Sequence, residues 1–142
     1  MPKGTRIVPW SALVAMLAAP LAAYQPHIPL DVRATDRPDT FEVFEQRGAG
    51  PSHIWCVAAD HARRNLGAQS NQRIYVASPL GPSQTEPGRT AVGFTLSADQ
   101  AGLEAGQAGA ATLLGYTSIR TTGASMNLTQ ALQFCTDHMD VP

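Results

Sequence analysis

Two cysteines, Cys56 and Cys135, are the feature of the sequence that most restricts how the chain can fold. They lie 79 positions apart. A disulfide between them would restrict the unfolded chain, and the chain-entropy model gives a loop of this size about 4 to 5 kcal/mol of stabilisation. That is a large part of the roughly 5 to 15 kcal/mol that stabilises a typical domain. Whether the bond forms depends on the compartment, because disulfides persist mainly outside the reducing cytosol.

The first 23 residues have the pattern of a secretory signal peptide. Lys3 and Arg6 form a basic start, the run that follows to residue 19 is apolar and uncharged, and small residues lead up to Ala23, after which we predict cleavage. The alternative is a retained membrane anchor, which needs about 18 to 20 uninterrupted apolar residues. Pro9 and Pro20 interrupt the apolar residues and leave too few. Export and an even number of cysteines together favour a Cys56–Cys135 disulfide.

Beyond the signal, the chain divides into a leader and one domain. Residues 24–39 contain three prolines and no periodic pattern, which predicts an extended leader. Residues 40–142 are long enough for a single hydrophobic core. We therefore expect one domain after the leader.

The charge of the chain limits the classes of partner. Ten basic residues stand against 11 acidic ones, and removal of the signal takes away Lys3 and Arg6, so the remainder is more acidic. It lacks the basic stripe that nucleic acid or an anionic membrane surface requires. We expect no nucleic-acid partner, no membrane span after cleavage and no cofactor. A partner would be an envelope or extracellular protein.

Local patterns predict four strands and two helices. Runs of β-branched and aromatic residues bounded by glycine and proline indicate the strands, and apolar residues at helical spacing indicate the helices. The order strand, helix, three strands, helix predicts an α+β fold with a mostly antiparallel sheet of three to four strands and both helices on one face. The predicted strands are 40–47, 73–78, 90–97 and 111–121, and the predicted helices are 52–67 and 128–138.

The first predicted helix places Trp55 in the core. Ser52 is a suitable N-cap and Gly67 a suitable left-handed C-terminal residue. At 100° per residue, Trp55 belongs to an apolar stripe with three alanines and Leu66, and Cys56 lies about 60° outside that stripe. Cys135 lies in the apolar stripe of the last helix. If both helices cover one face, the two cysteines can meet, as a disulfide requires.

Catalysis and metal binding are the alternative roles for Cys56. Papain-like hydrolases place a nucleophilic cysteine at a helix N-terminus, where its pKa falls, beside a histidine base. No histidine follows a strand at a spacing typical of that class. His53 and His61 are separated by over two helical turns, about 12 Å, too far to share one ion. Cys135 with His138 could chelate a metal only if Cys135 were reduced, so we predict no metal site.

The segment 79–89 is the predicted partner-contact loop. Its prolines and glycines argue against regular structure, and eleven residues exceed the usual length of a hairpin loop. Prolines also reduce the entropy lost on binding. A tolerated surface insertion is the alternative. The residues predicted to form this contact surface are Pro79, Leu80, Pro82, Pro87 and Arg89.

Four segments, "IWCVAADHARRNLG", "RIYVASPLGPS", "GRTAVGFTL" and "ALQFC", resemble a group of small exported proteins of alphaproteobacteria. Those proteins carry a similar aromatic-Cys-x-Ala-Ala helix and a closing Phe-Cys. The resemblance covers residues 40 to 136, brings no assigned activity, and implies export and paired cysteines. We predict a periplasmic or secreted, non-catalytic binding or structural module. The alternatives are a cysteine-dependent hydrolase with Cys56 as nucleophile and an inhibitor that presents the 79–89 loop.

Overall fold

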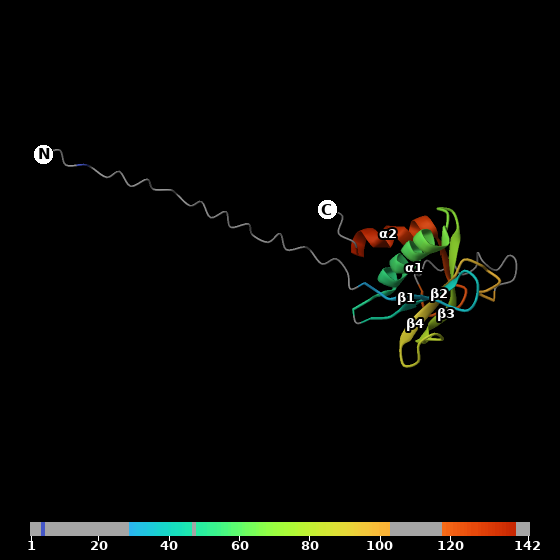
Figure 1. The fold of residues 1–142 in the computed structure, drawn as a ribbon. Coiled ribbons are helices and arrows are strands. Elements are labelled where there is room, and N and C mark those ends of the chain that lie inside the picture. Colours follow the sequence, from blue (N-terminus) through green and yellow to red (C-terminus); the bar gives the residue numbers. More distant parts are fainter. Residues whose placement is uncertain (1–3, 5–28, 47, 103–117, 139–142) are drawn as a thin grey trace.

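The computed structural model describes residue 4 and residues 29–46, 48–102 and 118–138, which Figure 1 draws in colour. The predicted signal peptide, apart from Gly4, and residues 111–117 of the predicted fourth strand lie outside this part of the chain. In the part that is described, no helix is long and apolar enough to cross a membrane.

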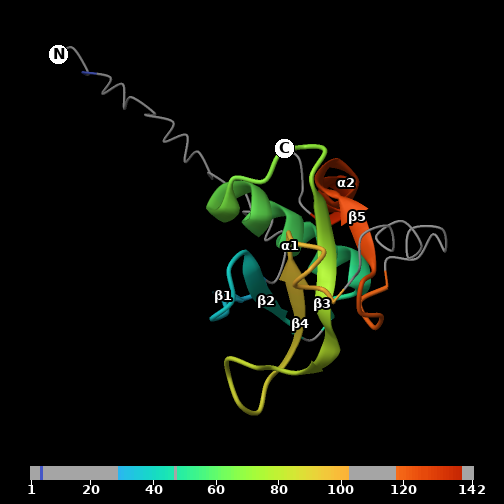
Figure 2. The same cartoon turned by 90° about the vertical axis from the view of Figure 1, so that its right-hand side faces the viewer.

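Five antiparallel strands form one sheet in the order β1-β2-β4-β3-β5, and two helices pack on one face of it. Figures 1 and 2 show α1 and α2 side by side, with the turn between β3 and β4 at the far end of the sheet. The α+β prediction is confirmed, although the sheet has five strands where three to four were predicted. The elements are β1 (Val32–Ala34), β2 (Thr40–Phe44), α1 (Pro51–Leu66), β3 (Arg73–Pro82), β4 (Thr90–Thr95), β5 (Ser125–Asn127) and α2 (Leu128–His138).

Strand β2 is buried along its whole length. Successive side chains of a strand point to opposite faces, so Phe41 and Val43 enter the core under the helices. Glu42 and Phe44 therefore face the other side of the sheet. Both faces of β2 are covered, and only one of them is covered by helices.

Helix α1 begins and ends at residues that its sequence explains. Pro51 occupies the first helical position, where its missing N–H is no loss. The N-cap is Gly50, without a side-chain hydrogen bond, so the predicted Ser52 cap was wrong by two positions. Gly67 ends the helix in the left-handed conformation, with φ 67°, as predicted.

Strand β3 continues past Pro79, where the sequence predicted its end. The pairing of β3 with β4 shifts twice, between Val76 and Ser78 and again between Ser78 and Gly81. Each shift is a bulge with an extra residue on β3, and proline is tolerated at bulges because the ladder there needs no N–H. The predicted 79–89 loop is consequently shorter, since Pro79, Leu80 and Pro82 belong to the strand.

Two strands have positions that the sequence did not predict. β1 lies within the predicted leader, where it pairs with β2. Residues 118–121, the described end of the predicted fourth strand, form no strand, and the last strand is β5 instead. β5 pairs with the first three residues of β3. Asn127 then caps α2, since its Oδ1 accepts a hydrogen bond from the Gln130 N–H at 2.8 Å.

Candidate functional site

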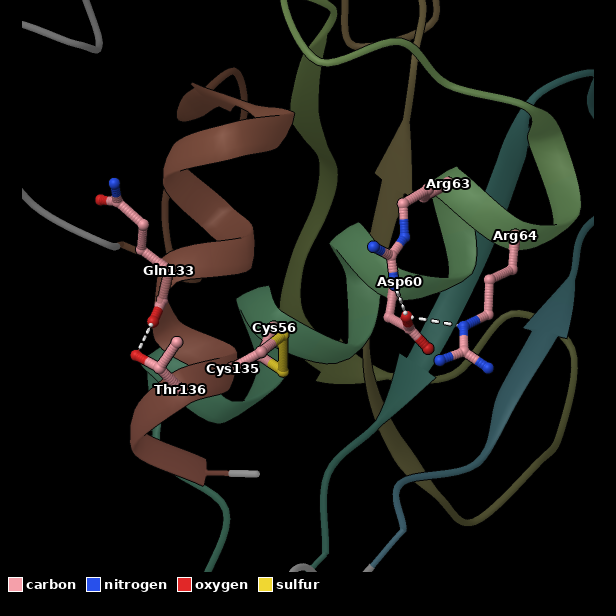
Figure 3. Close-up of a disulfide and its surroundings, with 7 residues drawn as sticks. All are labelled: Cys56, Asp60, Arg63, Arg64, Gln133, Cys135 and Thr136. Atoms are coloured by element: carbon pink, nitrogen blue, oxygen red, sulfur yellow. Dashed lines mark hydrogen bonds and ion pairs between the residues drawn. A yellow bond between two sulfur atoms is a disulfide. The ribbon is translucent and has the colours of Figure 1, made fainter. Parts of the chain in front are cut away.

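A disulfide joins Cys56 of α1 to Cys135 of α2, as predicted, with a Cα–Cα distance of 4.9 Å. Figure 3 shows the bond in the space between the two helices. Both residues are buried, with 1% of Cys56 and 8% of Cys135 exposed. An intact disulfide leaves Cys56 no thiolate to act as nucleophile and Cys135 none to bind a metal. No cluster of three metal-ligating side chains occurs among the described residues.

Trp55 lies fully buried between α1 and the sheet. Its ring meets that of Phe94 edge to face, with centroids 5.0 Å apart. Its indole Nε1 is buried without a hydrogen-bond partner in the described part of the chain. Trp55 thus contributes apolar volume to the core while leaving a polar N–H unsatisfied.

His61, on α1, packs against the ring of Phe41 at a centroid distance of 4.6 Å. Burial lowers the pKa of His61, although the neighbouring carboxylate of Asp60 acts in the opposite direction. Asp60 itself accepts hydrogen bonds of 2.8 Å from Arg63 and Arg64, as Figure 3 shows. These groups form a solvated helix surface and no nucleophile or metal site.

The other face of β2 contains a buried carboxylate. Glu42 is 2% exposed. Four donors meet it, all from residues 83–85: Oε2 accepts the Ser83 hydroxyl at 2.7 Å, the Thr85 hydroxyl at 2.6 Å and the Thr85 N–H at 3.2 Å, and Oε1 accepts the Gln84 N–H at 2.7 Å. The segment 83–89, named here the 83–89 turn, is therefore fastened to β2 through one side chain.

The 83–89 turn also holds itself together. The Ser83 Oγ accepts the N–H groups of Thr85 and Glu86 at 3.1 and 2.9 Å. At the ends, the Ser83 N–H donates to the Arg89 carbonyl at 2.8 Å. Serine commonly stabilises tight turns in this way.

Gly93 of β4 lies beside Glu42 and has no side chain that would stand between Glu42 and the turn. It is the register partner of Glu42 on one side and of Ser78 on the other. A Cβ at Gly93 would lie 3.0 Å from the Ser78 Cβ, closer than ordinary packing allows. Glycine at this position permits the close approach of β3, and no side chain from β4 separates the Glu42 carboxylate from the turn.

Arg89, the last residue of the turn, packs its guanidinium group on an aromatic ring. Its guanidinium carbon lies 4.0 Å from the centre of the Phe44 ring, within cation–π distance. It also pairs with Asp31 at 2.9 Å and with Glu86 at 3.3 Å. Arg33 of β1 lies 3.5 Å from Glu86. These ion pairs are partly exposed, so each contributes little by itself, but together they join the turn to β1.

A shallow depression of about 490 Å³ lies beside the end of the turn. Its lining residues come from the end of the turn and the start of β4 and from the connection between β2 and α1. The lining residues are Glu45, Gln46, Gly48, Ala49, Gly88, Arg89 and Thr90. The lining is mainly polar, so an apolar small molecule would gain little there.

The hydrogen bonds keep Glu42 ionised in spite of its burial. Desolvation by itself would raise the pKa of Glu42, since it disfavours the charged form. The bonds from the Thr85 hydroxyl, the Gln84 N–H, the Ser83 hydroxyl and the Thr85 N–H outweigh this effect and lower the pKa of Glu42 below its ordinary value of 4.5. The turn is thus held by a full negative charge at neutral pH.

Two of the five residues of the predicted contact loop belong to the turn. Pro87 is exposed, and Arg89 is folded onto Phe44. Sequence reasoning missed Glu42, which a strand of alternating pattern assigns to solvent. One signal was present, because "TFEVF" places Phe44 on the same face as Glu42, and an aromatic residue there indicates a covered surface.

Comparison of the chain with protein-family models, with curated protein sequences and with solved structures gives no significant match.

Proposed function

We propose that this protein is an exported, non-catalytic binding module that presents the 83–89 turn to a protein partner. The observation that carries the proposal is the fastening of the turn by four hydrogen bonds to Glu42. A turn that is ordered before binding loses little conformational entropy when a partner docks. A mere surface insertion needs no buried carboxylate dedicated to its shape.

Several features support export. The disulfide requires an oxidising environment to persist. Residues 1–23 carry the signal-peptide pattern, and the resemblance to small exported alphaproteobacterial proteins points to the same compartment. A periplasmic or secreted location fits all three, and the partner is then an envelope or extracellular protein.

The shape of the turn favours insertion into a concave partner surface. Its most exposed residues are Gln84, Pro87 and Gly88, none of which is charged. The turn is tight, with Arg89 N–H returning to the Glu86 carbonyl at 3.3 Å, and Arg89 is held by Phe44. An inhibitor that mimics a peptidase substrate would need an extended exposed segment instead, so a convex docking element fits this geometry better.

A capture experiment tests the proposal. The purified domain is immobilised and exposed to an envelope extract at pH 7, and retained proteins are identified by mass spectrometry, purified and titrated. Gln84→Arg places a charge at the tip of the turn, and we expect about tenfold or more weaker binding, as at the centre of an interface. Gln133→Arg makes the same change at an exposed position of α2 and is the matched control.

Equal binding by the wild-type, Gln84→Arg and Gln133→Arg proteins would reject the turn as the contact surface. Equal loss in both variants would assign the effect to charge in general and would reject it as well. Circular dichroism of each variant verifies that the fold is intact.

A further inference from the structure

The full set of four hydrogen bonds that Glu42 accepts requires the ionised carboxylate. A carboxylate accepts at both oxygens and donates at neither, whereas a protonated carboxyl group donates at one of them. Three donors already converge on Oε2 and one on Oε1. A proton on Oε2 would make the Ser83 or Thr85 hydroxyl an acceptor and so remove one of the four bonds, and a proton on Oε1 would need an acceptor where the contact among the described residues is the Gln84 N–H, a donor.

Resting on the binding function proposed above, we propose that Glu42 is a proton-operated latch of the 83–89 turn. Its carboxylate holds the turn in the shape offered to a partner, and uptake of one proton from solvent releases the turn while the rest of the domain stays folded. The product is the neutral acid, and the donors of residues 83–85 turn to water.

The surroundings of Glu42 confine this release to one segment. The backbone bonds of β2 with β4 do not involve the carboxylate, and the core on the helix side of the sheet is apolar. Gln84 is the weakest point of the turn, because within the described part of the chain its N–H donates only to Glu42. Its amide therefore reports the state of the latch directly.

The charged groups around the latch are few. On β1, Arg33 is the register partner of Glu42, and Asp31, which precedes β1, pairs with Arg89. On the turn itself, Glu86 lies between Arg33 and Arg89. The neighbouring positions on β4 and β3, Gly93 and Ser78, carry no charge. Glu86 is thus the carboxylate most easily confused with Glu42, and its replacement provides the control.

The pH range of release follows from the direction of the pKa shift. Because hydrogen bonding lowers the pKa of Glu42 in the folded protein, the contribution of the carboxylate is fully present above its ordinary value of 4.5. It is lost as the pH falls below 4.5 and through the pKa of the folded state. The turn is therefore latched at neutral pH and released in acid.

Amide hydrogen exchange measured by NMR on the purified chain tests the latch without any partner. Rates are divided by those of an unstructured peptide at the same pH, so that only protection is compared. We expect the Gln84 amide to lose about ten- to hundredfold protection below pH 4.5, the size typical of a hydrogen bond to a charged group. Val92 and Phe94 of β4 should stay protected, and the change should reverse on return to pH 7.

Two variants assign the effect. Glu42→Gln should show the low Gln84 protection already at pH 7, without a further step in acid. Glu86→Gln removes the partly exposed ion pairs with Arg33 and Arg89 and should retain the acid step at Gln84. If Glu42→Gln does not fold, the wild-type and Glu86→Gln titrations decide. Unchanged Gln84 protection down to pH 3, loss together with Val92 and Phe94, or a step that Glu86→Gln abolishes would each overturn the latch.

Amide exchange and partner capture, taken together, test the latch and the binding function separately. A turn that is released in acid, in a protein whose capture does not depend on Gln84, would retain the latch and reject the proposed partner surface. A turn that stays protected in acid, in a protein whose capture does depend on Gln84, would reject only the latch.

Discussion

The two faces of strand β2 are closed by opposite chemistry. On one face, Phe41 and Val43 meet helix α1 through apolar contact, and a disulfide ties α1 to α2. On the other face, Glu42 and Phe44 meet the 83–89 turn through hydrogen bonds and a cation–π contact. Neighbouring residues of one strand thus stabilise a helical layer and a polar turn.

Because their chemistry differs, the two faces of β2 should resist different perturbations. Apolar packing depends on volume and is insensitive to protons, whereas a carboxylate surrounded by donors depends on its charge. The helix face should therefore respond to changes of size, to reduction and, through the partly buried His61, to acid below pH 6.5. The turn face should respond to acid below pH 4.5 and to loss of single acceptors. Substitutions on either face test whether the two faces respond separately.

Removal of the disulfide should have the largest effect. Cys56→Ala with Cys135→Ala frees the unfolded chain from a 79-residue closure, and we expect the free energy of unfolding to fall by about 4 to 5 kcal/mol. Urea denaturation measures it. Under folding conditions, the Gln84 amide should keep its protection, and its loss would show that the two faces are not independent.

Trp55→Ala should be next, with a loss of about 3 to 5 kcal/mol from the cavity beside Phe94. Trp55→Phe keeps most of the volume and removes the unsatisfied Nε1, so it should cost clearly less. Thermal unfolding compares the two. Equal losses would mean that the indole N–H has a partner that stabilises the core.

Gly93→Ala tests the path by which Glu42 reaches the turn. The new Cβ would lie 3.0 Å from that of Ser78, and such overpacking costs about 1 to 3 kcal/mol. Gly81→Ala in β3 is the control, since its Cβ would meet only the Pro79 carbonyl oxygen, at 3.6 Å. Chemical denaturation of both variants measures the difference in the free energy of unfolding. Equal stability of the two variants would contradict the requirement for glycine at position 93.

Asn127→Ala should weaken the helix face by about 1 kcal/mol, the usual size of an N-cap. The Oδ1 that accepts the Gln130 N–H is lost. Urea denaturation measures the loss, while amide exchange should show it at the start of α2 and leave residues 83–85 unchanged. A change confined to the turn instead would contradict the assignment of α2 to the other layer.

The smallest effect should be the pH dependence that His61 adds to that of Glu42. Burial lowers the pKa of His61 below its ordinary 6.5, so the neutral form favours folding. Stability is then full above pH 6.5 and falls as the pH decreases through the folded-state pKa, in addition to the Glu42 step below pH 4.5. His61→Gln should remove the first step, measured as denaturation midpoint against pH, and leave the second.

The sequence was informative where one element determines the outcome. The stripe containing Trp55, the left-handed Gly67 and the apolar face of α2 follow from helical spacing and local conformation, and each is found in the structure. The predicted end of the strand at Pro79 was wrong, because pairing with a neighbouring strand sets where β3 ends. Pro79 lies within β3 because two bulges relieve its missing N–H, and bulges depend on the register with β4.

The α+β fold and the two helices that carry the cysteines follow from the sequence alone, because hydrophobic periodicity and helix-end residues are local properties. The role of Glu42, in contrast, depends on the folded arrangement of three strands. A glutamate in an alternating strand is usually solvated, and nothing within "TFEVF" refers to a turn more than 40 positions away. Its donors, residues 83–85, come together only when β4 lies between β2 and β3 with Gly93 opposite the carboxylate. A charge is tolerated in a buried site when enough donors surround it, and that condition exists only in the folded chain.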